Sequence, residues 1–320
     1  MMKNTGRKLP MRQEGKRLAS FFEPKHMIVS VLLCIALLVA LLLGVHYYKY
    51  YIKNDWTVIS YPSVTGGQTQ FYTITDRQGH LVIIDGGYAD DAEQIKSIIA
   101  NFGNHVDAWI LTHPHPDHVE AFDTIMADYP DVDISIDKIY VTPVHEERYK
   151  ETAKDYDNYG TYEIYSALIS KMDNVTALQA GDEIDLIGLK MKVLHAWDDY
   201  VDQFENNLCN NGSLMFKVSG KEKSMLFCAD TQSEVENEII SAYGDDLKAD
   251  YVSCGHHGNW GLTTTFYDLV DPELAFMDCP SSILEDSSGK YDAPQLKAYF
   301  DAKGVTVYSF EDGQHSVVLK

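Results

Sequence analysis

The pattern of apolar and polar positions changes sharply near the N-terminus. A basic segment, residues 1–26, is followed by Met27–Val45, 19 residues without a charged side chain. As a helix this stretch is about 28 Å long, close to the ~30 Å hydrocarbon core of a bilayer. A cleaved signal peptide fits less well, because no small-x-small cleavage site follows the apolar run. The pattern therefore predicts a transmembrane anchor over residues 27–48, with the tyrosines and lysines of 47–53 at the membrane interface.

From residue 56 onward, short strand patterns alternate with helical ones. Strand patterns fall at 57–61, 70–75, 81–84, 108–111, 138–141, 189–196, 214–218, 224–228, 251–254, 274–277, 305–308 and 315–319. Helical spacing of apolar residues falls at 92–102, 119–127, 234–242, 264–269 and 294–302. Two such runs fit an α/β fold, a four-layer αββα sandwich over residues 56–320.

Residues 146–172 interrupt this alternation with a group of tyrosines. They are Tyr149, Tyr156, Tyr159, Tyr162 and Tyr165. One interpretation is a pair of helices whose tyrosines pack along one stripe. The other is a lid or a wall of a substrate pocket, since long irregular segments often carry function.

One stretch carries most of the chain's chemistry: Thr112–His118, which reads Thr-His-Pro-His-Pro-Asp-His. A strand ending at Leu111 places it at the carboxyl edge of a sheet, where α/β folds hold their sites. Pro114 and Pro116 oppose a helix, so we expect a stiff loop rather than a helical face to present these side chains. Three imidazoles and a carboxylate together suit zinc, manganese or iron.

This stretch resembles the metal-binding signature of the metallo-β-lactamase superfamily, and further segments agree with that family in the same order. They are Leu81–Gly87, a strand with an acidic turn; Ser224–Thr231, which contains Asp230; and Asp250–Gly258, which ends in His-His-Gly. The Asn-rich turn Asn206–Ser213 resembles the branch found in ComEC-type DNA-uptake proteins and choline-phosphate esterases. The resemblance implies the αββα fold and a metal-dependent hydrolase.

The resemblance also implies one or two divalent ions, zinc or manganese, held by six side chains. By this resemblance, His113 and His115 hold the first ion. Asp117, His118 and His257 hold the second, and the Asp230 carboxylate bridges the two. Asp117 and His256 are expected to act in catalysis, His256 by protonating a leaving group or contacting a phosphate. The alternative for His256 is a hydrogen-bonded structural residue.

Two further residues are expected beside the ligands, and one ligand of the family is missing. Asp85 is expected to accept a hydrogen bond from a ligand imidazole, or to cap the following Gly-Gly turn. Many members carry another histidine before the bridging aspartate, where this chain has its Asn-rich turn with Asn211. Only His145 and His195 fall in that interval, and His195 is either a ligand or a buried core residue.

Charge is divided unevenly along the chain. The first 53 residues have a balance of +7, whereas the remaining 267 have a balance of −29. An acidic body repels long polyanions, so we expect a small phosphoester rather than nucleic acid as the substrate. A cationic head group would gain from this charge and from aromatic faces. The aromatic candidates for such a pocket are Trp260, Trp197 and Tyr200.

The basic N-terminal segment also predicts an orientation in the cell membrane. Seven Lys and Arg precede the anchor, and two follow it before residue 54. The positive-inside rule then places the N-terminus in the cytoplasm and the catalytic domain outside, on a single-pass anchor. Cys209 and Cys279 could pair in an oxidising compartment, but the sequence alone does not decide this.

The leading hypothesis is therefore a membrane-anchored, metal-dependent hydrolase that acts on a phosphoester or phosphodiester. A β-lactamase or lactonase acting on a carbonyl is one alternative. A nuclease related to DNA uptake is another, although no run of Lys and Arg interleaves with aromatic residues in the body. A catalytically weak binding module is the alternative from a different class.

Overall fold

The computed structural model describes residues 24–48 and 54–320, which divide at residue 54 into two compact units. Each unit is described by itself. Residues 1–23 of the predicted cytoplasmic tail and residues 49–53 of the predicted interfacial segment lie outside the described residues.

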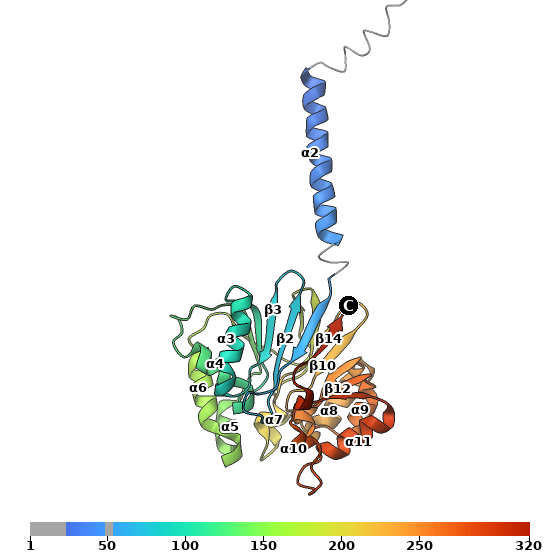
Figure 1. Cartoon of the computed structure of the whole chain (residues 1–320). Helices are drawn as coiled ribbons and strands as arrows, with labels where there is room; N and C mark the ends of the chain where they lie inside the picture. Colours follow the sequence, from blue (N-terminus) through green and yellow to red (C-terminus); the bar gives the residue numbers. More distant parts are fainter. Residues whose placement is uncertain (1–23, 49–53) are drawn as a thin grey trace, which may run out of the picture. The chain divides into compact units, whose positions relative to one another are not determined.

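The described part of the N-terminal unit is helix α2 (Pro24–Tyr47) (Figure 1). None of its side chains is buried, and its most apolar 18-residue window has a mean hydropathy of 3.2. The helix predicted for this region is therefore present. By length and composition alone, α2 is suited to cross a membrane.

In the described part of the body, the strands form two seven-stranded sheets. The first sheet has the spatial order β14 (His315–Leu319), β1 (Trp56–Ser60), β2 (Phe71–Asp76), β3 (Leu81–Asp85), β4 (His105–Leu111), β5 (Ser135–Val141), β6 (Val175–Ala177). The second has the order β13 (Thr306–Tyr308), β12 (Leu274–Phe276), β11 (Tyr251–Ser253), β10 (Ser224–Phe227), β9 (Met215–Ser219), β8 (Leu189–His195), β7 (Glu183–Leu186). Both sheets are mixed, with parallel pairs from β3 to β6 and from β10 to β13.

Alternating side chains of the strands pack in two different hydrophobic cores. In β3, Val82 and Ile84 belong to the core between the two sheets, whereas Leu81 and Ile83 belong to the core under the helices. Both faces are apolar because both are covered, as expected for the inner strands of a layered α/β fold. Phe216 and Phe227 stack across the inner core, with ring centroids 5.0 Å apart.

Helices cover the outer face of each sheet, with one group beside the first sheet and the other beside the second (Figure 1). Their bounds are α3 (Ala92–Asn101), α4 (Pro116–Met126), α5 (Glu146–Thr152), α6 (Tyr159–Ile169), α7 (Leu208–Asn211), α8 (Ser233–Tyr243), α9 (Thr264–Val270), α10 (Ser281–Leu284) and α11 (Ala293–Lys303). Two sheets flanked by helices confirm the predicted αββα sandwich.

The tyrosine-rich segment forms α5 and α6, and most of its tyrosines pack inward. Tyr149, Tyr162 and Tyr165 are buried, which confirms the packing interpretation for these three. Tyr156, between the two helices, is 61% exposed. This residue instead lines the cavity described below.

Candidate metal centre

Strand β4 delivers the histidine-rich motif to the carboxyl edge of its sheet. His113 lies in the segment after the strand, whereas Asp117 and His118 belong to the first turn of α4. The prediction that the prolines would keep the whole motif out of a helix, with the helix starting at 119, is wrong. Pro116 occupies the first turn of α4, where a missing N–H costs no intrahelical hydrogen bond. His115 is the N-cap residue, with extended backbone.

Four donor side chains from three parts of the chain converge at this first turn of α4. Asp117, His118, Asp230 and His257 each offer one ligand atom, and these four atoms lie within 4.8 Å of one another. His257 Nε2 is 3.1 Å from an Asp117 carboxylate oxygen, and His118 Nε2 is 3.2 Å from Asp230 Oδ1. We call these four residues the Asp230 group. Its mixture of imidazole and carboxylate suits zinc, manganese or iron.

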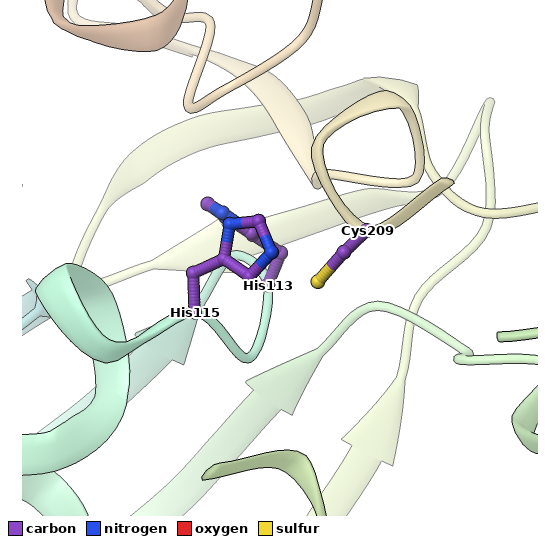
Figure 2. Close-up of side chains that lie close together, drawn as sticks. All are labelled: His113, His115 and Cys209. Carbon is purple, nitrogen blue, oxygen red and sulfur yellow. The ribbon is translucent and has the colours of Figure 1, made fainter. Parts of the chain in front are cut away.

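A second group lies next to the first and contains Cys209, which the sequence predicted only as a possible disulfide partner. Ligand atoms of His113, His115 and Cys209 lie within 4.8 Å of one another, and all three residues are buried (Figure 2). We call these three residues the Cys209 group. The predicted possibility of a Cys209–Cys279 disulfide is not realised, because both cysteines are free.

Within the Asp230 group, the Asp230 carboxylate is the side chain that faces the Cys209 group. Its Oδ1 faces His118, whereas its Oδ2 is 3.7 Å from His113 Nε2 and 3.6 Å from His256 Nε2. A carboxylate whose two oxygens face neighbouring donor groups has the geometry of a bridging ligand.

Several buried nitrogen atoms of these groups have no hydrogen-bond partner in the described part of the chain. They are His113 Nε2, His115 Nε2, His118 Nε2 and His257 Nδ1. A buried polar atom without a partner is unfavourable by about 1–3 kcal/mol, so native proteins rarely keep several together. The donor set and these unsatisfied atoms fit one or two divalent ions. The Nε2 atoms of His113, His115 and His118 are the ones that would bind an ion.

Asp85, at the end of β3, holds one of the ligand imidazoles in place. Its Oδ2 is 2.8 Å from His118 Nδ1, and it accepts further hydrogen bonds from Gln70 Nε2 and from the backbone N–H and hydroxyl of Thr112. The hydrogen bond at Nδ1 directs Nε2 of His118 toward Asp230. The Asp85 backbone has a φ of 54°, a left-handed conformation that is rare for a residue with a side chain.

The carboxylates and imidazoles of the Asp230 group shift one another's pKa. Burial opposes charge on Asp230, but the imidazoles of His257 and His118 outweigh it and hold its pKa well below the ordinary value. Burial likewise opposes charge on His257, yet the contacts with Asp230 and Asp117 raise its pKa to about 10. A metal ion binds neutral imidazole, so its binding must displace protons from this group.

The histidine pair after β11 sits in an unusual turn. His256 and His257 have φ of 50° and 60°, so two consecutive residues with side chains are left-handed. Gly258 follows with a φ of 82°, and a Cβ there would lie 2.6 Å from Met277 Cε. This turn separates the two imidazoles: His257 is buried in the Asp230 group, whereas His256 faces a cavity. Strained backbone of this kind is frequent at functional sites.

The centre opens into a cavity of about 690 Å³. Its lining includes the ligand candidates His115, Asp117 and Asp230, together with His256. The other lining residues are Tyr88, Pro116, Tyr156, Asn206, Asn207, Asn210, Gln232, Ser233, Glu234 and Trp260. None of these lining residues, all within the described chain, is a lysine or an arginine, so the cavity carries carboxylates without a fixed cation.

The predicted pocket residues fall in different places. Trp260 is 49% exposed and lines the cavity, with its ring centroid 6.4 Å from that of His256. Trp197 and Tyr200 do not line it, so the prediction that they wall a pocket there is corrected. Trp197 is buried, and its indole N–H donates to Asp202, whereas Tyr200 packs against Phe204. Trp197 also packs edge-on against Tyr149, so both rings serve packing.

The residues of the Asn-rich turn are also placed by the structure. Asn210 lines the cavity, whereas Asn211 is fully buried and its side chain has no hydrogen-bond partner among the described residues. His195 Nε2 is 2.6 Å from the Asn211 carbonyl oxygen, and burial lowers the His195 pKa. A neutral His195 therefore donates to this carbonyl, which corresponds to the core alternative rather than to a ligand.

Residues 64–196 match the family model of the Metallo-beta-lactamase superfamily. The matched range contains Asp85 and the histidine-rich motif but ends before Cys209, Asp230 and His257. Among curated proteins, the chain is 22% identical to ComE operon protein 3 of Bacillus subtilis over 228 residues. This match covers 66% of the chain but 27% of that protein, so the chain spans about a quarter of this relative.

Solved structures share the fold at low sequence identity. The crystal structure of CmlA, a diiron β-hydroxylase from Streptomyces venezuelae, gives a TM-score of 0.53 at 13% identity, covering 82% of this chain and 54% of that one. The metallo-beta-lactamase fold protein YhfI from Bacillus subtilis gives 0.48 at 12% identity, covering 83% of this chain and all of that one. The similarity to CmlA supports the fold and leaves the reaction open.

Proposed function

Because this chain carries a metallo-β-lactamase domain, we propose that it is a metal-dependent hydrolase that cleaves a small phosphoester or phosphodiester. The observation that carries the proposal is the pair of adjacent donor groups beside an open cavity. The Asp230 carboxylate contacts imidazoles of both groups. Hydrolysis at such a centre needs bound ions, a place for water and a site for the substrate, and the cavity provides the last two.

Different residues of the chain would bind the ions and orient the ligands. The Cys209 group and the Asp230 group would hold zinc, with manganese as the alternative, and such ions supply a Lewis acid and lower the pKa of bound water. Asp85 fixes the ring of His118, and Asp230 spans both groups. These contacts fix the donor atoms before the substrate arrives, which is how a preorganised site lowers a reaction barrier.

His256 is the residue that we propose for proton exchange with the substrate. Its Nδ1 is 2.6 Å from the Asn259 carbonyl oxygen, so this nitrogen donates and Nε2 is left toward Asp230 and the cavity. Burial lowers the His256 pKa, which favours the neutral ring near neutral pH. In this state Nε2 accepts a proton first and can then return it to a leaving group.

The charge of the cavity supports a small or zwitterionic substrate. Glu234 lines the cavity outside the two donor groups, and the body around the cavity has a balance of −29. Long polyanions are therefore repelled, while a cationic head group is attracted. Trp260 and Tyr156 present exposed aromatic side chains at the same cavity, and a cation over an aromatic face gains about 0.5–2 kcal/mol.

A substrate panel tests the proposed reaction. The full-length chain, purified in detergent and loaded with zinc or manganese, is offered phosphomonoesters, phosphodiesters, a β-lactam, a lactone and duplex DNA. We expect turnover of a small phosphoester or phosphodiester. Hydrolysis of the β-lactam or lactone alone would place the reaction at a carbonyl, and salt-insensitive cleavage of duplex DNA would favour a nuclease.

A substitution at Trp260 tests the substrate class. Trp260→Ala should raise KM for a phosphoester with a quaternary ammonium group more than for its uncharged analogue, because only the first gains from the ring. The pair of substrates is the control, since a general defect raises both KM values equally. Equal effects on both substrates would count against an aromatic subsite for a cation.

We also propose that α2 anchors the body to the outer face of the cell membrane. The support is the length and hydropathy of α2, together with the excess of Lys and Arg before it. A small extracytoplasmic phosphoester would then reach the centre without crossing the membrane.

A further inference from the structure

We propose that the Cys209 thiolate is a ligand of the first metal ion, where it takes the position of the histidine that the sequence lacks. The inference deepens the metal centre proposed above and rests on the proposal that the centre holds ions. It does not depend on which bond is hydrolysed.

The placement of Cys209 against two imidazoles is the first observation. Its sulfur lies with ligand nitrogens of His113 and His115 inside a group no wider than 4.8 Å, and Figure 2 shows the side chain pointing toward the two rings. A single zinc ion binds nitrogen at about 2.0–2.1 Å and thiolate sulfur at about 2.3 Å. Small side-chain movements are enough to bring these three donors to one ion.

The unsatisfied imidazole nitrogens are a second, independent observation. Nε2 of His113 and Nε2 of His115 are buried and form no hydrogen bond with any described residue, and the two residues are only 1% and 7% exposed. The carboxylate oxygens near them are Asp230 Oδ2, 3.7 Å from His113 Nε2, and Asp157 Oδ1, 3.5 Å from His115 Nε2, and neither contact forms a hydrogen bond. Two buried nitrogens without hydrogen bonds, on rings that lie beside one thiol, require a group that satisfies them. An ion shared with Cys209 meets this requirement for both.

The fold holds Cys209 in this place through the short helix α7. Asn207, with a φ of 57°, turns the chain into α7, and the carbonyl oxygen of Asn211 is 2.6 Å from His195 Nε2. Thr142 donates to the Gly212 carbonyl oxygen, and a Cβ on Gly212 would lie 2.6 Å from Trp197 Cδ2. These contacts fix α7 against the body, so the thiol is preorganised rather than mobile.

A packing role explains Cys209 less well than it explains the other buried cysteines. Cys228 and Cys254 are equally buried, but neither belongs to a group of metal-ligand side chains in the described chain. Cys209 packs in the same core but also lies beside the imidazoles of His113 and His115. Packing alone does not explain a thiol placed against two imidazoles, whereas a thiolate at this place is stabilised by a metal ion. On binding, the thiol releases its proton to solvent and the sulfur lone pair forms the bond to the ion.

Cobalt substitution of the full-length chain in detergent tests the inference directly. Two equivalents of Co²⁺ should produce a near-ultraviolet thiolate-to-cobalt charge-transfer absorption in the unsubstituted chain. The absorption should be lost in Cys209→Ala and in Cys209→Ser and kept in Cys228→Ala, the matched control at another buried cysteine. Cys209→Ala should retain the visible absorption of the ion in the Asp230 group, which shows that the variant is folded. Bound metal should fall from two ions per chain to one.

A second measurement needs no variant. X-ray absorption of the zinc-loaded chain, which averages over both zinc ions, should contain one zinc–sulfur distance of about 2.3 Å per chain. No sulfur scattering, or a charge-transfer absorption that survives in Cys209→Ala, would overturn the inference. Phosphoester turnover measured on the same samples separates the two proposals: turnover without a sulfur ligand removes only this inference, and a sulfur ligand without turnover removes only the proposed reaction.

Discussion

At the scale of single residues, Asp85 shows how a side chain outside the donor groups can control the metal. Its hydrogen bond to His118 Nδ1 fixes the ring that faces Asp230. Asp85→Ala should weaken metal binding by about 10- to 100-fold, because the imidazole loses its orienting acceptor. Competition with a chelator of known affinity measures this loss. Asp55→Ala, at an exposed ion pair with Arg77, is the control and should bind metal as the unsubstituted chain does.

Asp123, on α4, predicts a dependence of stability on pH. Burial, followed by the nearby Glu120, raises the pKa of this carboxyl to about 8. Its ordinary value is 3.8, so the native state holds a proton that the unfolded state has released, and stability must fall as the pH rises from about 4 to about 8. Asp123→Asn removes this loss and should retain more of its stability between pH 5 and pH 9.

Thermal unfolding at the two pH values measures the effect, since 1 kcal/mol corresponds to about 2–4 °C in a domain of this size. Asp128→Asn, an exposed carboxyl just after α4, is the control. Equal loss of Tm in Asp123→Asn and the unsubstituted chain would contradict the prediction.

Single residues also show which parts of the site the sequence could predict and which it could not. The motif was sufficient to name His113, His118 and Asp117 because three imidazoles and a carboxylate in seven positions are rare outside metal sites. Cys209 was missed as a ligand because the sequence pointed only to a possible disulfide with Cys279. Only the folding of α7 brings it to His113, and no spacing in the sequence records that approach.

At the scale of elements, the turn after β11 places His257 in the Asp230 group. Gly258→Ala should shift this turn, because a Cβ would meet Met277 while the φ of 82° is also strained. We expect metal binding to the Asp230 group to weaken along with stability. Gly304→Ala is the matched control: its φ is 73° but nothing lies within 4 Å of the new Cβ.

Both variants should lose about 1 kcal/mol to backbone strain, and only Gly258→Ala should lose metal affinity. Calorimetric titration with Zn²⁺, beside thermal unfolding, measures the two effects separately. Equal metal affinity in the two variants would contradict the proposed role of the turn.

The elements differ in how well the sequence predicted them. Strands such as β3 and β4 were predictable because apolar residues fill both faces. β6, β7 and α7 were missed: the two strands are the end strands of their sheets and, apart from Leu186, consist of half-exposed or exposed residues, and α7 has four residues. The start of α4 was misplaced because a proline inside the motif was interpreted as a helix breaker. Tertiary packing decides β6, β7 and α7, whereas the start of α4 follows the local preference for proline in a first helical turn.

At the scale of the whole molecule, the contrast between a basic N-terminus and an acidic body predicts a topology. Protease added to intact cells should digest the body and spare the first ~26 residues, as the positive-inside rule implies. An antibody tag at each end, followed by immunoblotting, measures which part survives. A body that is protected in intact cells but cleaved in inverted vesicles would reverse the assignment.

The central claim is that ions held by the Asp230 and Cys209 groups carry out hydrolysis, and one titration tests it most directly. The full-length chain is stripped with a chelator and reloaded stepwise with Zn²⁺, while phosphoester turnover and bound metal are measured on the same samples. We predict that turnover disappears on stripping and returns when one to two ions per chain are bound. His118→Ala should show no turnover after reloading, whereas the control His80→Ala should regain it. Full turnover in the stripped chain, or in His118→Ala, would contradict the account.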